Sequence, residues 1–342
     1  LHSYIDFPTK SIKFPKALEN LLHQEFTKIN IIACGTSYYA GLIGKYWIEK
    51  CCRIPVEVDI ASEFRYRNPP LSSNHLCIFI SQSGETADTL AALRYARSNG
   101  VQTLTLVNTP ESSMEREADY VLHLHAGPEV GVASTKAFIC QIALLQCFAF
   151  YLIQNKHIEE LAPQEFIQNL LKAPEAIQNV LEMNSDIQKI AQNLQSCTNL
   201  IYVGRGQEVP LALEGALKIK ELSYIHAEAY PFGELKHGPI ALIDNQMISI
   251  VLAPSTTLFE KNLSNIQEIL ARNGKIIVLT DMPQKFIHHT QCLACLPLPK
   301  VDPVIIPYVY TVPLQLLAYH TAVLKGSDVD QPRNLAKSVT VE

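Results

Sequence analysis

The residues best suited to chemistry in this sequence gather between Leu211 and Pro239, where acids, lysines and histidines crowd together. Glu214, Lys218 and Glu221 are spaced four and three residues apart, which places them on one face of a predicted helix. A loop then brings His237 in front of a Gly-Pro pair. Carboxylate, amine and imidazole groups suit general acid–base catalysis. The alternative is a surface helix whose ion pairs contribute about 0.3–0.5 kcal/mol each.

Three hydroxyl-rich turns could bind a phosphate group. They are Gly35–Ser37, Ser81–Thr86 and Ala133–Lys136, and each is predicted to join a strand to a helix. In a doubly wound sheet such turns share one edge, where ligands bind. Hydroxyl groups, a glycine and free helix N–H groups suit a phosphate dianion. One turn alone could be an ordinary helix cap, but three favour a phosphate site in the first half. The counterpart turn Pro254–Thr257 lacks the glycine.

The elements that position these residues are short apolar strands alternating with helices. The predicted strands begin near Ile29, Leu76, Val101 and Tyr120 in the first half, and near Leu200, Met247, Lys275 and Cys292 in the second. Their spacings, about 45, 25 and 20 residues, recur in both halves and indicate an internal repeat. The fold class is therefore predicted as α/β, with two doubly wound, flavodoxin-like parallel-sheet domains and helices on both faces.

The pattern also predicts where the chain divides. We expect a helical lead-in at 1–27, a first domain at 28–160, a helical linker at 161–195, a second domain at 196–325 and an irregular C-terminal tail at 326–342.

Composition excludes several classes of protein. The 342 residues are 48% hydrophobic and 18% charged, with a net charge of -5, as expected for a folded chain of two domains. No basic block appears, so nucleic-acid binding is not expected. The longest apolar run, Ala137–Ile153, is interrupted by Gln141 and Gln146 and falls short of the roughly 18 residues that span a bilayer, so no membrane association is expected.

The nine cysteines are an odd number in a large chain, which favours free thiols and a cytoplasmic location. Cys292 and Cys295 form a CxxC pair without a second pair, and no metal site is expected there. The chain begins with Leu1 rather than Met, so we expect it to be a fragment of a longer protein.

Motifs along nearly the whole chain resemble the glucosamine-6-phosphate synthase family. They are CGTS at Cys34–Ser37, SQSGETADT at Ser81–Thr89, GVASTK at Gly131–Lys136, EGALKIKELSYIHAEAYPFGELKHGP at Glu214–Pro239 and QPRNLAKSVTVE at Gln331–Glu342. The resemblance implies the C-terminal isomerase half of that enzyme, built from two sugar-isomerase (SIS) domains. It implies that fructose 6-phosphate and ammonia, the latter from glutamine in the full enzyme, become glucosamine 6-phosphate. It implies neither a cofactor nor a metal.

The resemblance also assigns roles. Glu221 would move a proton between C1 and C2, and Lys218 would assist at the sugar hydroxyls. His237 would open the sugar ring, reaching in from the neighbouring subunit of a homodimer, and Lys337 would reach the C2 carbonyl. The phosphate would be held by Ser81, Gln82, Ser83 and Thr86, and the sugar would be contacted by Ser37, Val132, Ser134 and Ala336.

One part of the family's enzyme is not expected in this chain. The glutaminase domain, with its nucleophilic N-terminal cysteine, precedes the isomerase half, and this chain has no cysteine before Cys34. We therefore expect no glutamine hydrolysis. Two alternatives remain: a fructosamine-phosphate deglycase, and a module that senses sugar phosphates without catalysis. Within the central stretch, His226 is expected to be a core histidine more readily than a catalytic one.

Overall fold

The computed structural model describes residues 2–22, 24–156 and 163–341. The chain forms two compact units, Leu1–Gln168 with Ala336–Glu342, and Asn169–Leu335.

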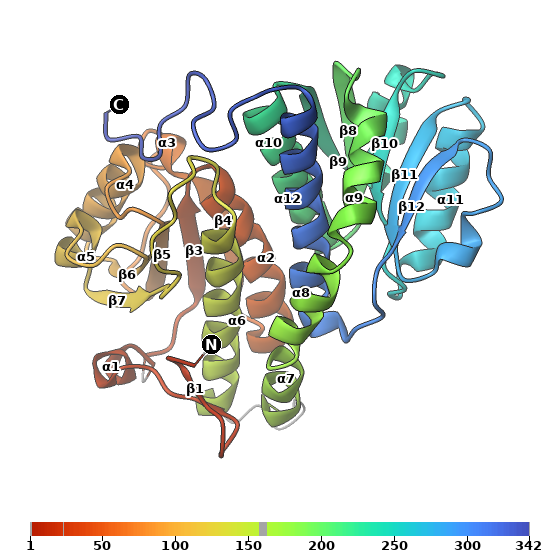
Figure 1. Ribbon diagram of the computed structural model, residues 1–342. Coiled ribbons are helices and arrows are strands. Elements are labelled where there is room, and N and C mark those ends of the chain that lie inside the picture. Colours follow the sequence, from red (N-terminus) through yellow and green to blue (C-terminus); the bar gives the residue numbers. More distant parts are fainter. Residues whose placement is uncertain (1, 23, 157–162, 342) are drawn as a thin grey trace. The chain divides into compact units, whose positions relative to one another are not determined.

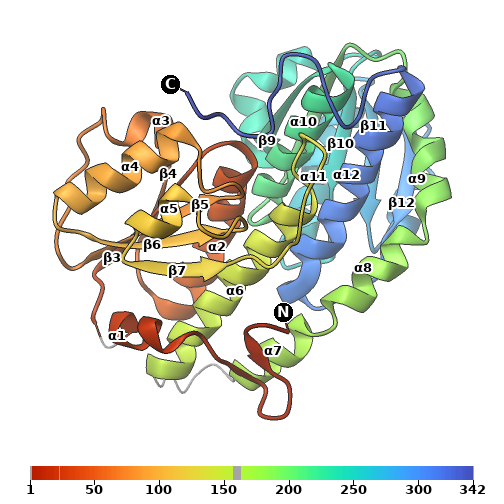
Figure 2. The ribbon, with the colours of Figure 1, turned by 60° about the vertical axis from the view of Figure 1, so that its left-hand side comes forward.

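The first unit is built on a five-stranded parallel sheet with the order β4-β3-β5-β6-β7 (Figures 1 and 2). Its strands are β3 (Lys28–Ala33), β4 (Val56–Ile60), β5 (His75–Ser81), β6 (Gln102–Val107) and β7 (Tyr120–His123). The central strands β3, β5 and β6 are buried along almost their whole length. That burial explains why they are near-continuous apolar runs in the sequence.

Helices cover both faces of this sheet. On one face α2 (Gly35–Cys52) packs against α6 (Lys136–Lys156), and on the other lie α3 (Ala61–Phe64), α4 (Ala87–Ser98) and α5 (Ser113–Glu117) (Figure 1). By length and hydropathy α6 could span a membrane over Lys136–Gln154, but 78% of the window is buried in the protein. Gln141 and Gln146 are fully buried within it. This burial is typical of the core helix of an α/β unit.

The lead-in differs from its prediction, because it opens with strands rather than a helix. β1 (Ile5–Asp6) pairs antiparallel with β2 (Ser11–Ile12), and only then follow the 3₁₀ turn η1 (Lys16–Leu18) and α1 (Glu19–Leu22). Ile5 and Ile12 are register partners and both are buried, which holds the hairpin closed. A helical prediction misses a hairpin this short, since each strand has only two residues.

The second unit repeats the architecture of the first. Its parallel strands are β8 (Asn199–Gly204), β9 (His226–Pro231), β10 (Ile248–Leu252), β11 (Lys275–Thr280) and β12 (Cys292–Pro297). Their order in the sheet is β12-β11-β10-β8-β9. If the strands of each sheet are numbered one to five along the chain, both sheets have the order 2-1-3-4-5. The predicted repeat of two doubly wound, flavodoxin-like sheets is confirmed.

On one face of the second sheet α10 (Glu208–Ser223) packs against α12 (Ile306–Leu324), with α8 (Ala173–Leu181) and α9 (Asn184–Ala191) against α12. On the other face lies α11 (Phe259–Leu270) (Figure 1). The remaining helical segments are α7 (Pro163–Leu170), η2 (Gln192–Leu194), η3 (Phe232–His237), η4 (Pro239–Leu242), η5 (Pro283–Lys285) and η6 (Pro303–Ile305). The predicted linker is thus helical where it is described, and residues 161 and 162 lie outside the described part. Between residues 327 and 341 the tail has no helix or strand, and Ala336–Glu342 belongs to the first unit.

Three local features were not predicted, or contradict one of the alternatives considered. The edge strands β4 and β9 were not predicted, because their exposed faces interrupt the apolar pattern with acids. The helix α10 is a buried element rather than a surface helix, since most of its residues are buried. His226 is no core residue either: its side chain on the edge strand β9 is 70% exposed.

Candidate functional site

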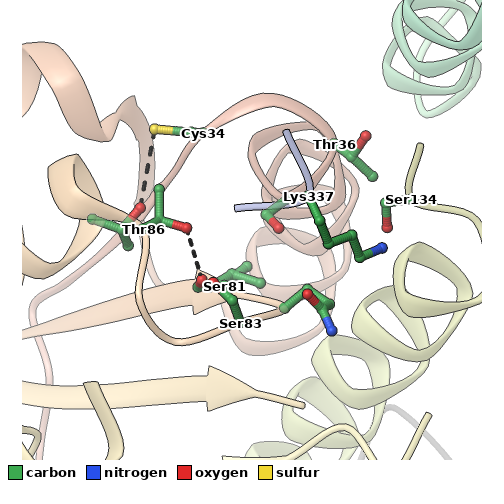
Figure 3. Close-up of a pocket in the computed structure, with 11 residues that line it drawn as sticks. Cys34, Thr36, Ser81, Ser83, Thr86, Ser134 and Lys337 are labelled. Carbon is green, nitrogen blue, oxygen red and sulfur yellow. Dashed lines mark hydrogen bonds between the residues drawn. The ribbon is translucent and has the colours of Figure 1, made fainter. Parts of the chain in front are cut away.

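A polar cavity of ≈ 120 Å³ lies in the first unit where strands β3 and β5 end (Figure 3). The chain leaves these neighbouring strands in opposite directions along the sheet, which is the usual ligand position in a doubly wound fold. The lining residues are Cys34, Thr36, Ser37, Ile80, Ser81, Gln82, Ser83, Thr86, Thr89, Ser134 and Lys337. All three predicted hydroxyl-rich turns contribute to this lining, together with one residue of the tail.

The turn after β5 folds around its own hydroxyl groups. The Gly84 N–H donates to Ser81 Oγ at 3.0 Å, and the Glu85 N–H donates to Ser83 Oγ at 3.1 Å. Ser81 Oγ also lies 3.0 Å from Thr86 Oγ1, as Figure 3 shows. These contacts fix the positions of the hydroxyl groups that face the cavity.

Gly84 is required at its position in this turn for two reasons. Its φ is +67°, a left-handed conformation that residues with a Cβ rarely adopt. A Cβ built there would lie 2.2 Å from Ser112 Oγ and 2.5 Å from Ser112 Cβ. Ser112 is buried, so its side chain has little room to move away. The glycine of the sequence motif therefore lets the turn pack tightly against the start of α5.

Two helices begin at the cavity without side-chain caps. The cap residues, Cys34 for α2 and Thr86 for α4, make no capping hydrogen bond from their side chains. The first N–H groups of an α-helix lack partners within the helix, and its dipole makes that end attractive to anions. Ser134 Oγ is buried and has no hydrogen-bond partner among the described residues. The cavity thus combines donor groups with a positive field.

The cysteine of the first motif lines the cavity but is a poor nucleophile. Burial raises the pKa of the Cys34 thiol, although the Thr89 hydroxyl opposes the shift. A raised pKa leaves the thiol protonated near neutral pH. Cys34 therefore serves as a wall residue.

The tail supplies an amine to this cavity. Lys337 Nζ donates to Glu129 Oε2 at 2.7 Å and to the Gly131 carbonyl at 2.8 Å. Its side chain lies across the cavity, with the ammonium on the side of Ser134 (Figure 3). Burial raises the pKa of Glu129, but the Lys337 ammonium and two backbone N–H groups outweigh it and hold that pKa below its ordinary value.

Two more contacts fasten the tail beside the cavity. Ser338 Oγ lies 3.0 Å from Ser83 Oγ, and the Val339 carbonyl accepts the Ala87 N–H at 2.9 Å. The second contact occupies an amide in the first turn of α4. The tail therefore binds the same turn and helix start that the sequence predicts for a phosphate.

The predicted sugar contacts are only partly at the cavity. Ser37 and Ser134 line it, and Ser37 Oγ accepts a hydrogen bond from Gln141 Nε2 at 2.8 Å. Val132 and Ala336 are not among the lining residues, and Ala336 is exposed. Sequence reasoning missed Thr36, Thr89 and Ile80 as lining residues, although each adjoins or belongs to a quoted motif.

The second unit holds the predicted acid–base pair on α10. Lys218 Nζ lies 2.5 Å from Glu221 Oε2 and 3.5 Å from Glu214 Oε1. Lys218 is 1% exposed and Glu214 2%, whereas Glu221 is 20% exposed. Burial lowers the pKa of Lys218, but the two carboxylates outweigh it and raise that pKa above its ordinary value. Glu214 is therefore an ion-pair partner, as expected, inside the protein rather than on its surface.

His237 closes the 3₁₀ turn η3 of the second unit, and its side chain is exposed. The neighbouring Lys236 pairs with Glu268 at 2.7 Å on the surface. Within the described ranges, no group of three or more His, Cys, Asp or Glu side chains is arranged to hold a metal ion.

The chain contains two copies of one parallel-sheet fold, and the first copy has a hydroxyl-lined cavity between the strand ends from which the chain departs in opposite directions. These features define a class of protein, and a comparison with models of protein families identifies that class. The model of the SIS domain matches residues 21–151 and 193–325, and the chain belongs to the SIS-domain family.

Individual relatives narrow the match. Over 93% of its length the chain is 55% identical to the glutamine–fructose-6-phosphate aminotransferase (isomerizing) of Zymomonas mobilis, of which it covers 53%. The chain thus spans about half the length of the curated relatives it matches. It is 41% identical to the solved C-terminal domain of glucosamine-fructose-6-phosphate aminotransferase from Francisella tularensis, with a TM-score of 0.89 and coverage of 94% of this chain and 91% of that one.

A more distant structure shares the fold alone. The glucosamine-6-phosphate deaminase of Thermotoga maritima superposes with a TM-score of 0.75 at 22% identity, covering 95% of both chains. At that identity the likeness carries no argument about the reaction.

Proposed function

We propose that this chain is the isomerising half of a glutamine–fructose-6-phosphate aminotransferase, and that it converts fructose 6-phosphate and ammonia to glucosamine 6-phosphate and water. The observation that carries the proposal is the cavity of the first unit, where hydroxyl turns and uncapped helix starts surround the amine of Lys337. The match to the Francisella C-terminal domain supports the same assignment.

In this proposal the phosphate binds at the turn after β5. Ser81, Ser83 and Thr86 would donate their hydroxyls, Gln82 its amide, and the start of α4 the N–H groups beyond that of Ala87, which the Val339 carbonyl occupies. Ser37, Ser134 and the backbone near Val132 and Ala336 would contact the sugar. The phosphate lies far from the reacting carbons, so its binding energy would serve to position them.

The reaction requires the open-chain form of the ketose, so the sugar ring must open first. His237 of a partner subunit in a homodimer would pass a proton to the ring oxygen. Lys337 would form an imine with the C2 carbonyl with loss of water, and ammonia would then displace the lysine amine, which leaves a C2 imine that carries the ammonia nitrogen.

The hydrogen transfer would follow. Glu221 would remove a proton from C1 of the C2 imine and deliver to C2 a proton that exchanges with solvent while the carboxyl holds it, leaving an aldehyde at C1 and an amine at C2. Lys218 would assist at the C1 hydroxyl. Its burial between two carboxylates supports this role, because the pair holds the ammonium in one place beside Glu221.

The proposed enzyme also has a further domain and a second subunit. A glutaminase domain elsewhere in the full-length protein would supply ammonia, and the enzyme would be a cytoplasmic homodimer. Support for the glutaminase domain comes from the length of the relatives, since this chain covers 53% of the Zymomonas protein. The exposed position of His237 is compatible with its donation to a neighbour.

The test is to supply the purified chain with fructose 6-phosphate, with and without ammonium, and to measure glucose 6-phosphate and glucosamine 6-phosphate. We expect glucose 6-phosphate without ammonium and no product that depends on glutamine. Binding of fructose 6-phosphate without turnover would instead indicate a sensing module. Turnover confined to fructosamine phosphates would indicate a deglycase.

A further inference from the structure

Glu129 stands out in the first unit because one buried carboxylate joins two separate parts of the cavity wall. It lies in the loop between β7 and α6, and its side chain is 5% exposed. Oε1 accepts the N–H groups of Thr135 at 2.9 Å and Ala137 at 3.1 Å, at the start of α6. Oε2 accepts Lys337 Nζ at 2.7 Å, across 208 residues of sequence. The carboxylate thereby meets both a helix N-terminus and the tail.

We propose that Glu129 is the positioning residue that holds Lys337 at the cavity, an inference that rests on the proposed function for its catalytic consequence. Lysine has a flexible four-carbon stem, so its amine needs an anchor to stay at one point. Here the anchor is itself fixed by two helix N–H groups, and the Gly131 carbonyl supplies a second acceptor for the amine.

The loop that contains Glu129 also contains Ser134, which lines the cavity on the side proposed to contact the sugar. Ser134, whose buried hydroxyl lines the cavity, lies directly before Thr135, one of the two residues whose N–H groups Glu129 binds. Replacing Glu129 is therefore expected to release the Lys337 side chain and to loosen the tail that carries it. The turn after β5 is held by its own hydroxyl contacts, so phosphate binding there does not depend on Glu129.

The variant Glu129→Gln separates these roles. Its amide oxygen can still accept the α6 N–H groups, whereas its NH₂ group cannot accept a hydrogen bond from Lys337. The matched control is Glu117→Gln, which removes an ion pair with Arg94 elsewhere in the same unit.

The first measurement does not require activity. Trypsin cleaves after lysine, so the rate of cleavage between Lys337 and Ser338, followed by mass spectrometry, reports whether the tail is held. We expect at least a fivefold faster cut in Glu129→Gln and wild-type behaviour in Glu117→Gln. Equal cutting in all three proteins would overturn the anchor itself, whatever reaction the protein catalyses.

The second measurement tests the consequence for catalysis. With fructose 6-phosphate and ammonium, Glu129→Gln should lower kcat for glucosamine 6-phosphate formation at least tenfold, change KM for fructose 6-phosphate less than threefold and keep wild-type affinity for inorganic phosphate. Glu129→Asp should recover part of kcat, because it restores the charge at a shorter reach. An unchanged kcat in Glu129→Gln beside an active wild type would refute the positioning role. An inactive wild type would instead refute the proposed function and leave the trypsin result to decide the anchor.

Discussion

The turn after β5 in the first unit and the turn after β10 in the second occupy the same place in the same fold. In the first, Ser83 Oγ accepts the N–H of Glu85. In the second, Thr256 Oγ1 accepts the N–H of Leu258 at 3.3 Å, again two residues on. The local turn chemistry is thus closely similar, and the difference lies in the charges around each turn.

The second turn has a carboxylate where the first has none. Asp281, at the end of β11, accepts the Ser255 N–H at 2.7 Å and also binds the Ser255 hydroxyl. Asn108 is the first-unit residue at the corresponding strand end, and it is neutral. The Asp281 carboxylate already accepts the hydrogen bond of the Ser255 N–H, which a bound anion would otherwise use. Its negative charge would also repel a phosphate. On the proposed function, a few charges would decide whether this fold position binds a phosphate.

The starts of α2 and α10 differ in the same sense. The helix α2 begins with Gly35, Thr36 and Ser37 at the cavity. The helix α10 begins with Glu208, which is 2% exposed, and burial raises the pKa of this carboxyl to about 7. The start of α2 therefore presents hydroxyl groups, whereas the start of α10 presents a buried carboxyl group.

The largest expected effect comes from giving the first turn the charge of the second. Ser83→Asp keeps an acceptor for the Glu85 N–H but places an anion beside the phosphate. We expect KM for fructose 6-phosphate to rise at least about 100-fold, or about 2.7 kcal/mol of binding. The matched control is Thr256→Asp in the second turn, which should leave KM unchanged. A KM that stays within threefold of wild type in Ser83→Asp would place the phosphate elsewhere.

The next prediction concerns stability rather than binding, and it closes the space that the first turn needs. Gly84→Ala should lower the free energy of unfolding by about 3 kcal/mol in urea denaturation, from the left-handed strain together with the clash with Ser112. Gly100→Ala is the control, since its φ is +71° but nothing lies within 4 Å of the added Cβ. It should cost about 1 kcal/mol. Equal losses in the two variants would show that the close packing of Gly84 is unimportant.

The smallest effect concerns the acid at the start of α10. Between pH 4.5, its ordinary pKa, and about 7, the folded chain keeps the Glu208 proton and the unfolded chain loses it. The folded state binds more protons in this window, so stability falls as pH rises and is lowest above pH 7. Glu208→Gln mimics the protonated form, so at pH 8 it should be about 2 kcal/mol more stable than wild type, with no gain near pH 4. Glu175→Gln, at an exposed acid of the same unit, is the control, and a gain that does not depend on pH would contradict the buried acid.

Much of this fold can be predicted from local sequence, because buried parallel strands are continuous apolar runs. The strand β11 begins at Lys275, and β3, β6, β7, β8, β10 and β12 begin within one residue of their predicted starts. The edge strands could not be predicted in the same way: β4 reads VEVDI and β9 reads HAEAYP, where half-exposed positions mix acids with apolar residues.

Some site residues could likewise be predicted from local sequence, and others could not. The hydroxyl turns could be found locally, since strand, turn and helix start are contiguous in sequence. Lys337 lies in a tail without periodicity, so only the family resemblance pointed to it. Its partner Glu129 was missed, because a contact across 208 residues leaves no local signal. An acid preceding a predicted helix was the one available hint.

The most direct test of the account follows hydrogen at C1 and C2 of the sugar in deuterium oxide by NMR. The wild-type chain, given fructose 6-phosphate, should produce glucose 6-phosphate that carries deuterium at C2. Glu221→Gln should bind fructose 6-phosphate within threefold of wild type and lose isomerisation by roughly 10²–10⁴-fold. Isomerisation at the wild-type rate in Glu221→Gln, or none in the wild type, would contradict the account.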